Sequence, residues 1–348
     1  MAKAGYFTAA YGKSHLSPFV AHGFDEGEIT HRRNDRETFS KTTSFITERS
    51  ASRQPFFLWL APNQPHIQSW SDQPPLNPGQ KWLDLYDPEK LSLPVNFRES
   101  PLRESIYNQG KPGEHVYRDQ QFMAAGLRAG PPRDAAHLRR FTHHYYAVVS
   151  HLDHQIGTLV EQMKDAAVWE NTVLIFMSDK GYHLGSHGLG NKFTMHEESV
   201  RVPTFATGPG IARGKRSQSL VSSIDLYPTL LALAAAEIPE WAMGKDLAPL
   251  FNDPDSTVRQ TIFAEAVGVG RLRQGHRMAF EGRHKLVLTG TDELYLFDHE
   301  SDPAEQVNQF NNPEYKEIAE QLQSALAECM REIGDRPFPD EGRGERGD

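Results

Sequence analysis

Two short apolar runs, each followed by a polar loop, constrain the fold of this chain more than any other feature. Residues 55–60 read PFFLWL and residues 172–177 read TVLIFM. Runs of this length without alternating polar side chains are typical of strands covered on both faces in a mostly parallel sheet. From about His137, apolar side chains recur every three or four positions and predict an amphipathic helix. A helix that leads into an apolar strand indicates βαβ connectivity, so we predict an α/β fold.

The rest of the sequence predicts further elements on both sides of this unit. Residues 7–11 and 202–207 predict two more strands, and a helix is expected around residues 224–235. Residues 259–299 contain several apolar stretches and look rich in strands. Apolar residues at spacings of three and four over residues 315–333 predict a final amphipathic helix.

A long segment in the first half of the chain has no sustained periodicity. Residues 69–135 are rich in proline, glycine and charged side chains. This composition predicts a surface excursion with local turns. Long irregular segments of this kind often serve function, so we expect the loop from Ser69 to Arg133 to shape substrate specificity.

The composition excludes several classes of protein. The chain has 46 acidic and 37 basic residues and a formal net charge of -9, which argues against a nucleic-acid partner. Cys329 is the only cysteine, so an intrachain disulfide and a cysteine-rich metal site are impossible. No apolar stretch approaches the ~20 residues that span a bilayer, and the first residues lack the apolar core of a signal peptide.

Asp179 is the first candidate for chemistry, because it closely follows the strand predicted over residues 172–177. In open α/β sheets, ligands bind at the edge formed by the carboxyl ends of the strands. A carboxylate at that edge can hold a hard cation such as calcium or magnesium. An aspartate in this position is also a common turn or helix-capping residue, so both interpretations stay open.

The glycine-rich segment after that strand is dense in potential cations. It contains Lys180 and Lys192, and the histidines nearby are His183, His187 and His196. Taken singly, each is most simply a solvated lysine or a loop histidine. Several cations in one loop beyond a strand favour an anion site, because a lysine acts as a point charge for sulfate or phosphate.

Two other predicted strands end in the same way. Lys13 and His15 follow the strand over residues 7–11, and His66 follows the strand over residues 55–60. Three separate strands thus lead to lysine, histidine or aspartate side chains. Because the carboxyl ends of parallel strands meet at one edge, we predict that these side chains converge on a single site.

The order and context of these residues resemble the motifs of the sulfatase family. GYFTAAYGKSHL, residues 5–16, is similar to the family motif GY-x-T-x-x-x-GK-x-H, and FFLWLAPNQPH, residues 56–66, resembles PFFLYLAPH-x-PH. The family's longest signature is matched at Tyr145, Leu152-Asp153, Gly157, Asn171-Thr172, Ser178-Asp179, Gly181, Gly188, Lys192, Glu197, Arg201-Val202-Pro203 and Gly208-Pro209-Gly210. Further family-like motifs are Asp225-Leu226-Tyr227-Pro228-Thr229, Glu293-Leu294-Tyr295 and Asp302-Pro303 with Glu305. The resemblance covers roughly residues 4–312.

The resemblance implies an alkaline-phosphatase-like fold, in which helices flank a mostly parallel sheet and a smaller C-terminal α+β subdomain follows. On this basis we expect a sulfatase-like domain over residues 1–250, a subdomain of short antiparallel strands and a terminal helix over residues 251–335, and a frayed tail over residues 336–348. It also implies hydrolysis of sulfate esters or sulfamates, a sulfated small molecule or carbohydrate as partner, and a periplasmic or secreted location.

Residue by residue, the resemblance assigns roles to the strand ends. Asp179 falls on one of the family's metal-binding aspartates, and that metal is usually calcium. Lys13, His15, His66 and Lys192 fall on the substrate-pocket lysines and the acid/base histidines. In a working enzyme, such lysines stabilise charge on the sulfuryl oxygens, and a histidine near the leaving oxygen can protonate it.

The chain departs from the family pattern in three places. The family's nucleophile is a formylglycine made within a C/S-x-P-S/T-x-R motif, and this motif is absent from the sequence. No Asp-Asp pair precedes Gly5, where the family has two metal ligands. Lys180 occupies the place of a further ligand, and a protonated lysine cannot coordinate a cation but can supply positive charge instead. We therefore expect no calcium binding at Asp179.

These departures leave the chain's origin and function open. It is interpreted either as an N-terminally truncated sulfatase or as a degenerate relative. The leading function is that of a sulfuric ester hydrolase by family, inactive as this chain. The alternatives are a phosphodiesterase or phosphonate monoester hydrolase of the same superfamily, and a non-catalytic protein that binds anions or sulfated carbohydrates.

Overall fold

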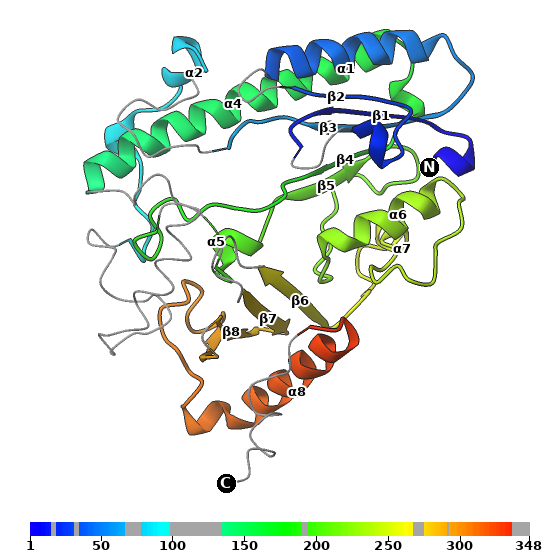
Figure 1. Cartoon of the computed structure of the whole chain (residues 1–348). Coiled ribbons are helices and arrows are strands. Elements are labelled where there is room, and N and C mark those ends of the chain that lie inside the picture. Colours follow the sequence, from blue (N-terminus) through cyan, green and yellow to red (C-terminus); the bar gives the residue numbers. More distant parts are fainter. Residues whose placement is uncertain are drawn as a thin grey trace.

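The strands of the protein form three sheets that lie one below another in Figure 1. The computed structural model describes residues 1–14, 19–30, 35–66, 78–97, 134–189, 192, 194–266, 275–290 and 292–335. Within these residues the sheets have three, two and four strands, and helices accompany the first and the last. This is the predicted α/β arrangement with a C-terminal subdomain.

The first sheet is entirely parallel and carries helices on one face. It consists of β1 (Phe7–Gly12), β2 (Glu26–Ile29) and β3 (Phe56–Ala61) in the order β2-β1-β3. The helices α1 (Asp35–Ser50) and α4 (Ala135–Asp165) lie along this sheet (Figure 1). Their buried side chains pack with those of β1 into one apolar cluster, which contains Ala9, Tyr11, Phe39, Phe45, Ile46, Leu152, Leu159 and Met163.

The second sheet is antiparallel, unlike the first. β4 (Leu174–Met177) and β5 (Thr204–Thr207) pair antiparallel, with Leu174 opposite Thr207. A parallel pairing needs a crossover, usually a helix. In the described part of the connection between these strands, the only helix is the four-residue α5 (Glu197–Val200).

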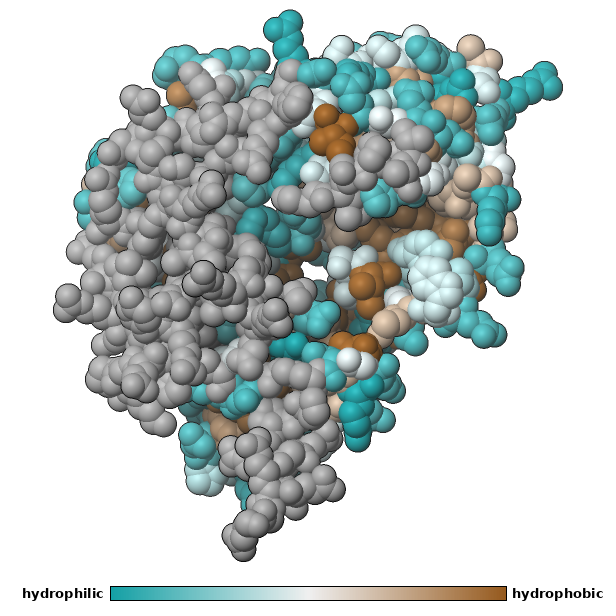
Figure 2. Space-filling view, viewed as in Figure 1, coloured by the Kyte–Doolittle hydropathy of each residue, from teal (hydrophilic) through white to brown (hydrophobic). Residues whose placement is uncertain are grey.

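The two apolar runs that we expected to be covered on both faces are only half-buried. No residue of β4 is fully buried, and the side chain of Trp59 in β3 is 45% exposed. On β5, the side chain of Phe205 is 52% exposed. Figure 2, viewed as Figure 1, shows hydrophobic side chains at the surface in this part of the molecule. In the described residues, β3 and β4 belong to different sheets, and each lies at the edge of its sheet.

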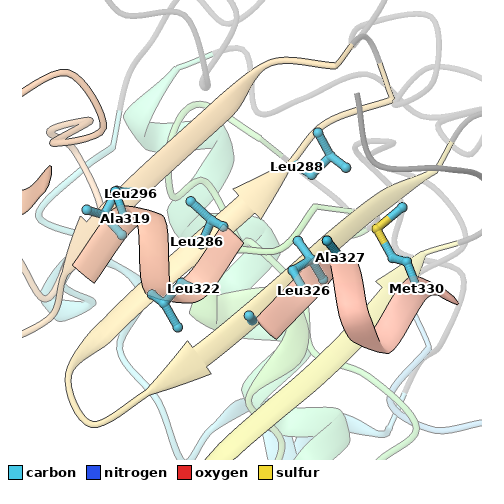
Figure 3. Packing of buried hydrophobic residues seen from close by; sticks show 9 residues of the cluster. Leu286, Leu288, Leu296, Ala319, Leu322, Leu326, Ala327 and Met330 are labelled. Atoms are coloured by element: carbon cyan, nitrogen blue, oxygen red, sulfur yellow. The ribbon is translucent and has the colours of Figure 1, made fainter. Parts of the chain in front are cut away.

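The C-terminal part forms an antiparallel sheet with a helix packed against it, as predicted. Four strands, β6 (Thr261–Ala266), β7 (His276–Glu281), β8 (His284–Leu288) and β9 (Leu294–Asp298), form an antiparallel meander. The helix α8 (Lys316–Glu332) crosses one face of this meander (Figure 3). The buried side chains between the helix and the sheet are Ala279, Leu286, Leu288, Leu296, Ala319, Leu322, Leu326, Ala327 and Met330.

Shorter elements connect these layers. α2 (Gln80–Leu83) lies near α4, with the Trp82 and His154 rings 5.1 Å apart. α6 (Leu226–Leu233) and α7 (Ala248–Asn252) follow β5. Much of the predicted excursion and all of the predicted tail lie outside the described residues. No helix in the described part of the chain is long and apolar enough to cross a membrane.

Candidate functional site

The ends of β1 and β3 are joined by backbone contacts that position Lys13 and His66. The N–H of Lys13 donates to the carbonyl of Ala61, the last residue of β3, at 2.7 Å. Gly12 makes this approach possible, because a Cβ there would lie 2.1 Å from the Ala61 oxygen and its φ is +115°. The two strands therefore present Lys13 and the loop leading to His66 at the same edge.

The loop before His66 is anchored by a buried carboxylate from α1. Asp35 accepts hydrogen bonds from the backbone N–H groups of Asn63 at 2.6 Å and Gln64 at 2.8 Å. The N–H of His66 then donates to the carbonyl of Asn63 at 2.8 Å, which closes a turn. Sequence reasoning missed Asp35, because the residue lies 28 positions before Asn63 and no motif connects them.

The segment after β4 is held by a close contact with α5. The N–H of Gly181 donates to the carbonyl of Ser199 at 2.9 Å. A Cβ at Gly181 would lie 2.0 Å from the Glu198 carbonyl oxygen, so only glycine fits. The hydroxyl of Ser178 donates to the carbonyl of Lys180 at 2.8 Å. These contacts set the direction in which Asp179 and Lys180 leave the strand.

Four cationic or potentially cationic side chains meet beyond the three strands, around the buried ring of Tyr182. The Nζ atom of Lys180 lies 3.4 Å from the centroid of that ring, and Nζ of Lys192 lies 5.4 Å from it. Nζ of Lys192 is also 3.3 Å from Nε2 of His66. Lys13 acts electrostatically on both of these lysines, so it completes what we call the cation cluster: Lys13, His66, Lys180 and Lys192.

The structure thus brings together most of the predicted site residues. Asp179 interacts electrostatically with Lys180 and Lys192, so it borders the cation cluster. His15 lies outside the described residues. Tyr182 was not predicted, and a tyrosine in a glycine-rich loop gave no signal of a cation–π contact.

Burial and mutual repulsion disfavour the protonated forms of the lysines in this cluster. Burial, and next the charge of Lys192, lower the pKa of Lys180 from 10.5 to about 6. Burial also lowers the pKa of Lys192. Asp179 opposes both shifts without cancelling them. The cluster therefore has a deficit of negative charge, which an anionic ligand would supply.

The side chains around Asp179 do not fit a divalent cation. A calcium site takes several carboxylate or carbonyl oxygens. Within the described residues, Asp179 does not belong to any group of three His, Cys, Asp or Glu side chains that could hold an ion. Its neighbours are lysines, which do not supply the carboxylate or carbonyl oxygens that such a site needs.

The three loop histidines form a second, buried group with acidic residues of α5 and the C-terminal part. The rings of His187 and His196 stack with centroids 4.0 Å apart, and the His183 and His196 centroids are 5.6 Å apart. Burial lowers the pKa of His183 to about 3 and holds that of His196 well below its usual value, so both rings are neutral. The nearest acids are Glu198 and Glu305.

Comparison with protein families connects both halves of the chain to sulfatases. Residues 1–236 match the family described as Sulfatase. Residues 185–332 match the family described as N-sulphoglucosamine sulphohydrolase, C-terminal.

Individual relatives are distant. A sulfatase of Formosa agariphila is 28% identical over 275 residues, which cover 79% of this chain and 50% of that protein. The chain thus spans about half the length of these curated relatives.

Solved structures share the fold. One, determined in complex with its substrate D-glucosamine-2-N,6-O-disulfate, has a TM-score of 0.74 at 20% identity and aligns over 99% of this chain and 82% of its own. The phosphonate monoester hydrolase of Silicibacter pomeroyi has a TM-score of 0.75 at 18% identity, over 95% of this chain and 78% of its own.

Proposed function

Because the chain belongs to the sulfatase family, we propose that its cation cluster binds the sulfate group of a sulfated small molecule or carbohydrate. The observation that carries this proposal is the convergence of Lys13, His66 and Lys192 beyond separate strands. Lysines act as point charges for the oxygens of sulfate, and a neutral or protonated histidine can donate to the same group.

Electrostatics favours an anion at this place. Two unit charges about 4 Å apart interact by about 4 kcal/mol at an effective dielectric constant of 20. In the absence of a ligand, burial lowers the pKa of Lys180, and repulsion from Lys192 lowers it further. A bound sulfate adds an attraction to each lysine, so it favours their protonated forms.

In this proposal Lys180 takes over the charge that a metal supplies elsewhere. Its ammonium, held over the Tyr182 ring, lies beside Asp179 and is available to the sulfate oxygens. Binding would then need no divalent cation. We also propose that this polypeptide binds without turnover, because its sequence lacks the C/S-x-P-S/T-x-R motif from which the family's nucleophile is made.

A phosphate or phosphonate group is the alternative ligand. It has the same tetrahedral shape as sulfate, and the fold is shared equally with a phosphonate monoester hydrolase. The match of residues 185–332 to an N-sulphoglucosamine sulphohydrolase region favours sulfate.

The test is calorimetric titration with inorganic sulfate, inorganic phosphate and glucosamine 6-sulfate in metal-free buffer. We expect saturable binding of the sulfated sugar, and we expect Lys192→Met to weaken it at least about tenfold, which corresponds to 1.4 kcal/mol. Lys90→Met is the matched control, since that side chain is 84% exposed on the surface. Equal loss in both variants, or binding only with added calcium, would contradict the proposal.

Turnover is tested separately with an aryl sulfate and an aryl phosphonate. Release of the phenol above the uncatalysed rate, abolished by Lys192→Met, would show that the polypeptide is an active hydrolase. The anion that is cleaved would then decide between the two ligand classes.

A further inference from the structure

The buried ring of Tyr182 lies at the centre of the cation cluster. Nζ of Lys180 is 3.4 Å from the ring centroid, and Nζ of Lys192 is 5.4 Å from it. The ring of His66 meets the Tyr182 ring at an interplanar angle of 77°, with centroids 6.1 Å apart. Three members of the cation cluster therefore surround one aromatic side chain, which none of the matched family motifs includes.

Given the proposed function, on which this role rests, we propose that Tyr182 is a positioning residue of the anion site. The face of its ring holds the ammonium groups of Lys180 and Lys192 where they meet the bound sulfate. The face of an aromatic ring is the negative part of its quadrupole, and it attracts an ammonium within about 6 Å of the centroid. Both lysines lie inside this range.

The two lysines need such a group to stay together. Their ammonium groups repel each other, and fixing a long lysine side chain costs rotamer entropy. Asp179 attracts both lysines, but it is exposed, and within the described residues no ion pair joins it to Lys180. The ring of Tyr182 is buried, and cation–π attraction is stronger where water is excluded.

An aromatic face suits an anion site better than a carboxylate does. A buried carboxylate would form hydrogen-bonded ion pairs with the ammonium groups and would repel the sulfate. The ring attracts the charge of an ammonium and leaves N–H donors available for the sulfate oxygens. Because a bound sulfate favours the protonated lysines, the attraction of the ring contributes more to sulfate affinity than to the stability of the free protein.

Neighbouring side chains fix the orientation of the Tyr182 ring. It packs with Leu138 and Phe141 of α4 in one buried cluster. The ring of Tyr145 meets it at 76°, with centroids 6.2 Å apart. A close-packed ring cannot turn away from the lysines, so it offers them a fixed surface.

Packing alone would also account for a buried tyrosine at this place. The two explanations differ in what they require of the ring. A packing role depends on the shape of the ring, whereas attraction of ammonium groups depends on the electrons of its face. Fluorine atoms on the ring withdraw these electrons with little change in shape, so a fluorinated series separates the two explanations.

The test replaces Tyr182 by phenylalanine and by phenylalanines with increasing numbers of ring fluorines, introduced at an amber codon. Each protein is titrated calorimetrically with glucosamine 6-sulfate in metal-free buffer. Tyr182→Phe should keep the affinity within about threefold, because the face of the ring is retained. The affinity should then fall stepwise with fluorination, by at least about tenfold for the fully fluorinated ring. The midpoint of thermal unfolding should change little across the series.

The same series at Tyr145 is the matched control. Tyr145 belongs to the same aromatic cluster, and within the described residues its ring contacts Tyr182 but no lysine. Fluorination there should leave the affinity unchanged. Equal affinities across the series at Tyr182, a complete loss already in Tyr182→Phe, or the same stepwise loss at Tyr145 would overturn the proposal.

NMR of protein containing isotope-labelled lysine tests the contact without a ligand. The ring current above the face of Tyr182 should shift the ε-methylene protons of Lys180 upfield, and Lys180→Met should remove that signal. A wild-type spectrum without such a signal would also overturn the proposal. Wild-type protein that binds no sulfated sugar would refute the proposed function and this role with it. Binding that is insensitive to fluorination would refute the role of Tyr182 alone.

Discussion

The C-terminal meander and the β4–β5 pair are built from similar sequences but reach different degrees of burial. β8 reads HKLVL, and its residues Leu286, Val287 and Leu288 have no exposed surface. β4 reads LIFM, and all of its residues remain partly exposed. The difference lies in the covering layer. Within the described chain, α8 covers the Leu286 and Leu288 side of β8, and Val287 packs in a separate cluster that includes Met195, whereas no layer there encloses β4 to the same extent. An apolar run therefore indicates a strand, but the neighbours decide whether it becomes core.

The largest expected effect follows from removing the buried ammonium of the meander. Lys285 is fully buried and pairs with Glu197 and Glu305. Lys285→Met should lower the free energy of unfolding by about 3–5 kcal/mol, because it removes the ammonium that pairs with the buried carboxylate of Glu305. Lys316→Met, on the exposed face of α8, should change it by less than about 1 kcal/mol. Urea denaturation of both variants measures the difference. Equal effects would show that the buried ion pairs of Lys285 do not stabilise the fold.

A matched pair of leucine truncations tests the comparison directly. Leu286→Ala in β8 should cost about 3–4 kcal/mol, since it removes a side chain from a closed core. Leu174→Ala in β4 should cost about 1–2 kcal/mol, because part of that side chain is already in contact with water. If Leu174→Ala is the more costly of the two under the same denaturant titration, the β4–β5 pair is covered by something beyond the described residues.

Acid should weaken the meander through its buried histidine. Burial lowers the pKa of His276 from 6.5 to about 4. The unfolded chain then binds a proton below about pH 6.5 that the folded chain does not take up until about pH 4. The free energy of unfolding is therefore highest above pH 6.5. It decreases by up to about 3 kcal/mol as the pH falls from about 6.5 to about 4.

The measurement is the pH dependence of the unfolding free energy between pH 7 and pH 4. His276→Phe should flatten part of the slope, while His154→Phe at an exposed position should leave it as in the wild type. An unchanged slope in His276→Phe would mean that other buried histidines, such as His183 and His196, account for the whole effect.

The smallest change in stability is expected on the exposed face of β5. Phe205→Glu should alter the unfolding free energy by less than about 0.5 kcal/mol, because half of the side chain is already exposed. The same substitution should reduce concentration-dependent self-association, since exposed apolar strands invite pairing. Sedimentation velocity at several concentrations checks this, and unchanged association would place the contact surface elsewhere.

The sequence predicted those helices and strands that have a clear pattern of apolar residues. The strands of the meander follow from the apolar stretches of residues 259–299, and the final helix and α4 follow from the spacing of their apolar residues. β2 and α1 were not predicted, because the sequence of β2 is EGEI and that of α1 is largely polar. Both elements are stabilised by their contacts with β1, although their own sequences do not favour a strand or an amphipathic helix.

The sequence by itself determined which residue types follow each strand, and hence that Lys13, His66, Asp179 and Lys180 lie at strand ends. Only the tertiary structure decided which of them meet. The contact between His66 and Lys192 joins residues 126 positions apart, and the histidines of the same loop pack with Glu305 instead of joining the cation cluster. The antiparallel pairing of β4 and β5 is likewise a feature of the tertiary structure that no local pattern predicted. The physical reason is that periodicity reports local conformation, whereas burial and charge pairing depend on segments brought together from distant parts of the chain.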